Sequence, residues 1–126
     1  MALIESKILA GTIEIKIEII YQGTHPVIAG YDYQLKEKNS NAVIDDQVGD
    51  NVNSQDDIYH LPTPIQDNVG RRAVITSKVA AVDLDSEFSV EIKVYQNNVL
   101  IDTLVSNGKV LISSGAVLSY DIIKFV

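Results

Sequence analysis

Residues 12–20, which read Thr-Ile-Glu-Ile-Lys-Ile-Glu-Ile-Ile, decide the fold class of this chain. Every second residue from 13 to 19 is isoleucine, and charged residues fill the positions between. A period of two is typical of a β-strand with one buried and one wet face. On a helix the same isoleucines would scatter around the axis, and their β-branching also favours a strand.

The same alternation recurs along the chain. It predicts further strands over 27–37, 71–82, 88–94 and 116–125, and an apolar run at 42–44 predicts a minor strand. Gln22 to Pro26 and Ser113-Ser114-Gly115 are turn signals. Asn97-Asn98 and Asn107-Gly108 each predict a tight hairpin, the second being the stronger signal.

With the apolar run 99–101 after the Asn97-Asn98 turn and a short edge strand near 58–61, these elements amount to about seven or eight strands and no significant helix. Such a pattern predicts an all-β, antiparallel two-sheet β-sandwich of immunoglobulin-like or jelly-roll type. A chain of 126 residues is expected to form one domain, residues 1–126, and is long enough to bury a core without disulfides.

Residues 45–70 stand out because they hold six Asp and three Asn. We expect a long acidic loop here, with a short edge strand near 58–61. Loops of this length in small domains are commonly functional or disordered.

The charge is equally uneven. The chain carries a net charge of −7, of which −6 falls in residues 39–70. An acidic chain repels phosphate backbones and anionic lipid surfaces, so we predict no nucleic-acid partner.

The chain has no cysteine, which excludes disulfides and thiol chemistry. The first residues lack a signal peptide and all apolar runs are short, so no membrane insertion is expected; a cytoplasmic protein and an exported chain without its leader both fit.

The acidic segment offers carboxylates for a calcium site. Ca²⁺ takes six to eight oxygen ligands, and the candidate ligands are Asp45, Asp46, Asp50, Asp56 and Asp57. The spacing of a known calcium loop is absent, so the sequence favours a solvated acidic loop over a calcium site. No cofactor other than calcium is predicted.

Two other groups of residues are candidates for ligand or partner binding. Tyr59 and His60 lie beside Asp56 and Asp57, a combination that suits a sugar ring, although the sequence favours Tyr59 as an anchor of the loop. Arg71 and Arg72 follow the acidic segment and could clamp a carboxylate of a partner, or hold the loop by ion pairs to Asp67 or its neighbours.

No nucleophile elbow or phosphate-binding loop occurs, so no catalytic residue is predicted. The sequence favours a non-enzymatic sandwich that acts by protein association, with itself or with another protein, through the acidic segment and the two arginines. The alternative is a lectin-type module that binds carbohydrate, with or without calcium. A hydrolase built on Asp56 and Asp57 is a more distant third.

Overall fold

The computed structural model describes residues 2–52 and 57–126. It contains nine strands: β1 (Ala2–Ser6), β2 (Ile15–Gly23), β3 (Val27–Lys36), β4 (Val43–Asp50), β5 (Ile58–His60), β6 (Arg72–Ala81), β7 (Ser86–Gln96), β8 (Val99–Val110) and β9 (Val117–Phe125). Two single 3₁₀ turns, η1 (Ile65–Asn68) and η2 (Ile112–Ser114), are the only helical elements in these two ranges.

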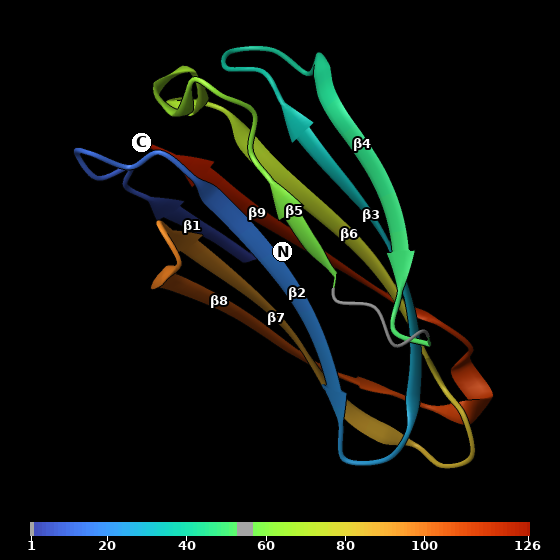
Figure 1. Ribbon diagram of the computed structural model, residues 1–126. Helices are drawn as coiled ribbons and strands as arrows, with labels where there is room; N and C mark the ends of the chain where they lie inside the picture. The colour runs from blue at the N-terminus through green and yellow to red at the C-terminus, as the bar shows by residue number, and fades with distance from the viewer. Residues whose placement is uncertain (1, 53–56) are drawn as a thin grey trace.

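The strands form two sheets (Figure 1). The five-stranded sheet has the order β1-β9-β6-β3-β4, and the four-stranded sheet has the order β5-β2-β7-β8. Neighbouring strands are antiparallel except β1 and β9, which run parallel. The prediction of an all-β chain with two sheets is confirmed, while the strand count exceeds the predicted seven or eight.

The alternating side chains meet in one core between the sheets. Ile15, Ile17 and Ile19 of β2 are buried there, facing Tyr33 and Leu35 of β3 and the inward residues of β7. Ile13 shares the parity of these isoleucines but is 79% exposed, because β2 begins only at Ile15. Burial of alternate residues from both sheets is the main source of stability of such an arrangement.

The expectation of a loop over residues 45–70 is wrong for its first part. Residues up to Asp50 belong to β4, which pairs with β3 from Gly30↔Asp50 to Lys36↔Val43. β4 lies at the edge of its sheet and is largely exposed, so its polar side chains cost little in a strand. The short edge strand predicted near 58–61 is present as β5.

The two predicted hairpins have opposite outcomes. Asn97 and Asn98 have φ of 50° and 65° and connect β7 to β8, so this hairpin is confirmed. Asn107 and Gly108 lie inside β8, so the second prediction is wrong. Gly108 is opposite Phe88, and a Cβ at Gly108 would lie 2.5 Å from Phe88 Cζ. The glycine therefore makes room for an aromatic ring.

The chain ends pair with each other, which the alternation did not predict for residues 2–6. β1 runs along β9 from Ala2↔Asp121 to Ser6↔Phe125. Phe125 is fully buried, as expected for an apolar carboxyl-terminal segment. Along β9 the inward side carries Asp121, Ile123 and Phe125, so Leu118, Tyr120 and Ile122 lie on the outer side, away from the core.

Candidate functional site

The predicted acidic residues are divided between two sides of the structure. Asp45 and Asp46 are neighbours on β4, so their side chains leave opposite faces. Asp50 ends the same strand and accepts a hydrogen bond from Val52 N at 3.0 Å, while Asp57 precedes β5. Asp56 lies outside the described residues. In the two described ranges no three Asp, Glu or His side chains group in a way that could hold a metal ion.

On the outer face of the five-stranded sheet, Asp46 lies next to Asp32 of β3. The hydrogen bond with Asp46 raises the pKa of Asp32, and burial raises it further. We call Asp32 and Asp46 the acidic pair. Gln34 donates from Nε2 to Asp46 Oδ2 at 3.4 Å, which fixes the pair on β3 and β4.

Tyr59 is half-buried and packs against the core. Its ring stacks on Tyr33 with 4.7 Å between centroids, and its hydroxyl lies 2.5 Å from that of Tyr31. Burial raises the pKa of all three phenols. His60 follows on the opposite face of β5 and is exposed. The structure therefore does not bring Tyr59 and His60 together as one ligand site, and Tyr59 anchors β5 to the core.

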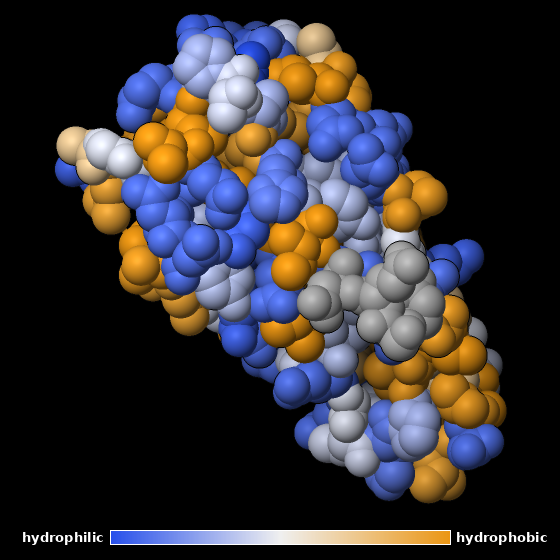
Figure 2. Space-filling view, in the orientation of Figure 1, coloured by the Kyte–Doolittle hydropathy of each residue, from blue (hydrophilic) through white to orange (hydrophobic). Residues whose placement is uncertain are grey.

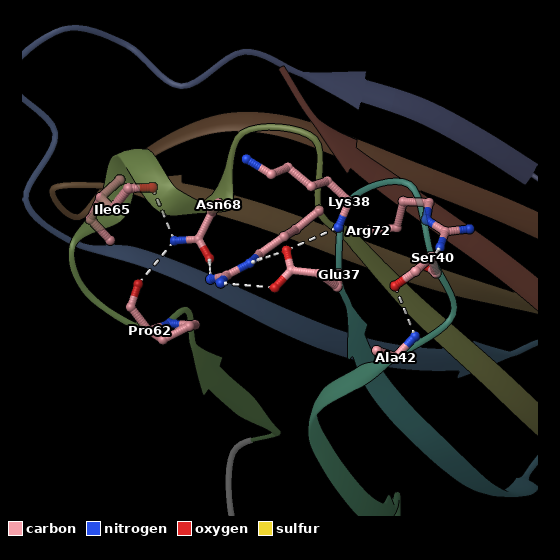
Figure 3. Close-up of polar contacts among 9 residues, drawn as sticks. Glu37, Lys38, Ser40, Ala42, Pro62, Ile65, Asn68 and Arg72 are labelled. Carbon is pink, nitrogen blue, oxygen red and sulfur yellow. Dashed lines mark hydrogen bonds and ion pairs between the residues drawn. The ribbon is translucent and has the colours of Figure 1, made fainter.

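Arg71, in the turn between η1 and β6, bonds Glu37 and Asn68, both of which are labelled in Figure 3. Its Nε donates to Glu37 Oε1 at 3.1 Å, and its Nη1 donates to Asn68 Oδ1 at 3.0 Å. Asn68 is fully buried and donates to the carbonyls of Pro62 and Ile65. The hydrogen bond from Arg71 lowers the pKa of Glu37. Arg71 thus has the structural role of an ion-paired arginine, but its carboxylate partner is Glu37 rather than Asp67.

Arg72 points the other way, onto the outer face of the five-stranded sheet. It lies directly between Lys36 of β3 and Lys124 of β9 in the register of the three strands. We call these three cations the basic row. Arg72 donates from Nη2 to the carbonyl of Ser40 and to Asn41 Oδ1 in the β3–β4 turn.

A pocket of about 380 Å³ opens beside the basic row. Its lining combines the β3–β4 turn with the ends of β6 and β9: Asn39, Ser40, Asn41, Gly70, Arg72 and Lys124. A second pocket, of about 660 Å³, lies at the other end of the four-stranded sheet and includes Gln22, Ser89 and Asn107.

The outer face of the five-stranded sheet also carries hydrophobic side chains. Leu118 is 70% exposed, Leu3 is 55% exposed, and Leu3 pairs with Ile122 across β1 and β9. Val74 of β6 pairs with Ile122 on its other side and is only 4% exposed, yet it lies outside the core cluster. We call this set the apolar patch: Leu3, Val74, Leu118, Tyr120 and Ile122. Figure 2, drawn in the orientation of Figure 1, shows a face on which hydrophilic and hydrophobic side chains are mixed.

Sequence reasoning missed both surface features. The apolar patch had a signal, since β9 is apolar at both parities, as in strands covered on both faces. The basic row had none, because its members are far apart in the chain and only the strand order β9-β6-β3 makes them neighbours.

No helix in the described ranges is long and apolar enough to cross a membrane. No protein-family model matches the chain, and neither a curated protein nor a solved structure matches it.

Proposed function

We propose that the chain is a non-enzymatic β-sandwich that self-associates through the outer face of its five-stranded sheet. Sheets of five and four strands also make up the variable-type immunoglobulin sandwich. The order of the strands is not that of the immunoglobulin sandwich. In the four-stranded sheet here, β2 is followed by β7 and then by β8. The sandwich is therefore immunoglobulin-like in layers and strand number only.

The apolar patch is the observation that carries this proposal. Its members on β1 and β9 are partly or largely exposed neighbours, so they form one surface rather than scattered exposed residues, and Val74 of β6 adjoins them but is itself buried. Single exposed apolar side chains are normal, whereas contiguous patches mark interaction sites.

The size of the face is sufficient for a dimer. The nine residues of β9 span roughly 30 Å, and five strands span roughly 19 Å across the sheet. Two copies packed face to face would bury roughly 1,200 Å², which reaches the lower limit for specific interfaces.

The charges on the same face favour a second copy as the partner. The basic row lies at one end of the face, and the acidic pair Asp32 and Asp46 lies along its β3–β4 side. In a two-fold symmetric pair each copy presents the same surface, so the cations of one can face the acids of the other.

The test is Leu118→Glu, with Leu100→Glu as the matched control. Leu100 is a 47% exposed residue of β8 in the other sheet, so both changes add one acid at an exposed leucine. Light scattering after size exclusion is expected to show a dimer for the wild type and for Leu100→Glu, and a monomer for Leu118→Glu. A monomeric wild type, or equal effects of the two variants, would contradict the proposal.

The lectin-type alternative gains no supporting contact, because Tyr59 is engaged with Tyr31 and Tyr33. It and the calcium site remain predictions, and mass spectrometry of the native protein with calcium and with EDTA tests the metal directly.

A further inference from the structure

The basic row gathers positive charge in an acidic protein. The chain has ten basic and seventeen acidic residues. Five of the ten basic residues nevertheless lie at the end of the five-stranded sheet where β3 and β9 end and β6 begins. These are Lys36, Lys38, Arg71, Arg72 and Lys124. Glu37 neutralises Arg71.

The three cations of the row face one another without matching carboxylates. Like charges directly opposite each other on a sheet are destabilising. In the described part of the chain, no carboxylate lies within 4.0 Å of Lys36, Arg72 or Lys124. Glu5 is the register neighbour of Lys124 on β1, and Asp32 feels the charge of Lys36, but neither forms an ion pair with the row. The row is therefore a place where an added anion would lower the electrostatic energy.

The adjoining pocket has the lining that an anion needs. Its six lining residues include two cations, two asparagines and one serine, and none is acidic. Within the described residues, Arg72 donates its side-chain hydrogen bonds from Nη2, which leaves Nε and Nη1 as donors for a ligand. The planar guanidinium suits the paired oxygens of phosphate or carboxylate, and Lys124 adds a point charge.

The β3–β4 turn holds this lining in place. Asn39 has φ of 57°, a conformation that asparagine tolerates, and the Ser40 hydroxyl accepts from Ala42 N at 3.2 Å. The bond from Arg72 to the Ser40 carbonyl joins the turn to β6 (Figure 3). The side chains that would bind the ligand are thus oriented before it arrives, which reduces the entropic cost of binding.

We propose that this pocket binds a small, multiply charged oxyanion, such as a phosphate ester or a polycarboxylate. Its volume of about 380 Å³ lies at the lower end of the range for small-molecule sites, which suits a compact ligand. The pocket adjoins the apolar patch, because Arg72 and Lys124 lie two residues from Val74 and Ile122 on the same strands. All its lining residues come from one copy, so binding does not require association of two copies.

The experiment is a titration followed by ¹⁵N NMR, with inorganic phosphate in one arm and citrate in the other, at constant ionic strength. The Leu118→Glu variant, in which the association is removed, is titrated beside the wild type. Saturable shifts are expected at the amides of residues 39–41, 70, 72 and 124 in the variant, and weaker binding is expected in the wild type, where the acidic pair of the second copy competes for the basic row. The arm with the lower dissociation constant identifies the phosphate or the carboxylate class.

Lys124→Gln and Arg72→Gln are each expected to weaken binding about tenfold, the usual effect of losing one charge-assisted hydrogen bond. Lys78→Gln is the matched control, because Lys78 is an exposed cation of β6 on the same face, away from the pocket. Lys124 is exposed, so its replacement should leave the fold intact even if Arg72→Gln disturbs the turn.

Shifts that never saturate in either arm, or equal weakening by Lys78→Gln, would overturn the pocket as a specific site. Failure of the titration while Leu118→Glu still yields a monomer would overturn this inference and leave the proposed association standing. Saturable binding by a wild type that proves monomeric would overturn the proposed association and leave this inference standing.

Discussion

Phe88 shows at the scale of one residue how the sheets are fitted together. Its register neighbours are both glycines, Gly23 on β2 and Gly108 on β8. A Cβ at Gly108 would lie within 2.8 Å of both Cζ and Cε1 of the ring. The ring is 6% exposed and belongs to the core, so it has little freedom to move aside.

We predict that Gly108→Ala lowers the free energy of unfolding by about 1–3 kcal/mol, the usual cost of overpacking. Gly30→Ala is the matched control, since the nearest atom to its Cβ would be Gly49 O at 3.8 Å. The control is expected to change stability by about 0.5 kcal/mol or less. Urea denaturation measures both, and equal values would show that the space at Gly108 is not needed.

The β7–β8 hairpin shows how an element depends on contacts beyond its own strands. Asn97 Oδ1 accepts from the backbone N–H of Ile13 at 2.9 Å and of Glu14 at 3.2 Å. Its Nδ2 donates to Gly11 O at 3.2 Å. Asn98, which has φ of 65°, makes only a surface contact with Lys16 Nζ. The first asparagine fixes the segment before β2, while the second mainly supplies the turn conformation.

The two asparagines should therefore respond oppositely to glycine. Asn97→Gly is expected to lower the free energy of unfolding by about 1–2 kcal/mol, because it removes these hydrogen bonds. Asn98→Gly is expected to raise it by about 0.5 kcal/mol, because glycine adopts positive φ without steric cost. Thermal and urea unfolding of both variants check this, and changes of the same sign would contradict the assigned roles.

The strand elements differ in how well their sequences define them. β2 and β7 alternate strictly and were predicted from their own residues. β1 was not predicted because it is short, and only the start of β4 was predicted, as the minor strand at 42–44, because β4 is polar at most later positions. Both are paired along their length with a neighbouring strand, β4 with β3 and β1 with β9. Strand propensity is too dependent on context to identify such edges.

Buried phenols connect the two sheets at the scale of the whole molecule. Tyr21 of β2 bonds Ser77 Oγ of β6 at 2.7 Å, and Tyr31 of β3 meets Tyr59 of β5. Burial raises the pKa of these phenols and of Tyr33 above the ordinary value of about 10. In alkali the unfolded chain therefore releases protons that the folded chain retains.

The direction of the pH dependence of stability follows from these raised pKa values. The stabilisation from the protonated phenols is fully present below about pH 10 and is lost as the pH rises above it. We predict that tyrosinate absorbance at 295 nm from these side chains appears together with loss of the native circular dichroism. A reversible change in absorbance of all six tyrosines with the native spectrum retained would contradict this.

For the candidate site residues, the sequence identified the positions and the tertiary structure decided their roles. Tyr59, Arg71 and Arg72 were picked out, but whether each is structural or exposed was settled by neighbours such as Tyr33, Glu37 and Ser40. The acidic run at residues 45, 46 and 50 read as one cluster, yet strand formation separates Asp45 from Asp46. Neither outcome could be obtained without knowing which strands pair.

The sequence by itself determined the all-β class, the central strands and the Asn97-Asn98 turn, because alternation and positive φ are local properties of the chain. The tertiary structure alone decided the apolar patch, the basic row and the pocket beside it. These depend on the order β1-β9-β6-β3, which places residues 36, 72 and 124 side by side. Strand order is set by the packing of both sheets against a shared core, and no local stretch of sequence encodes it.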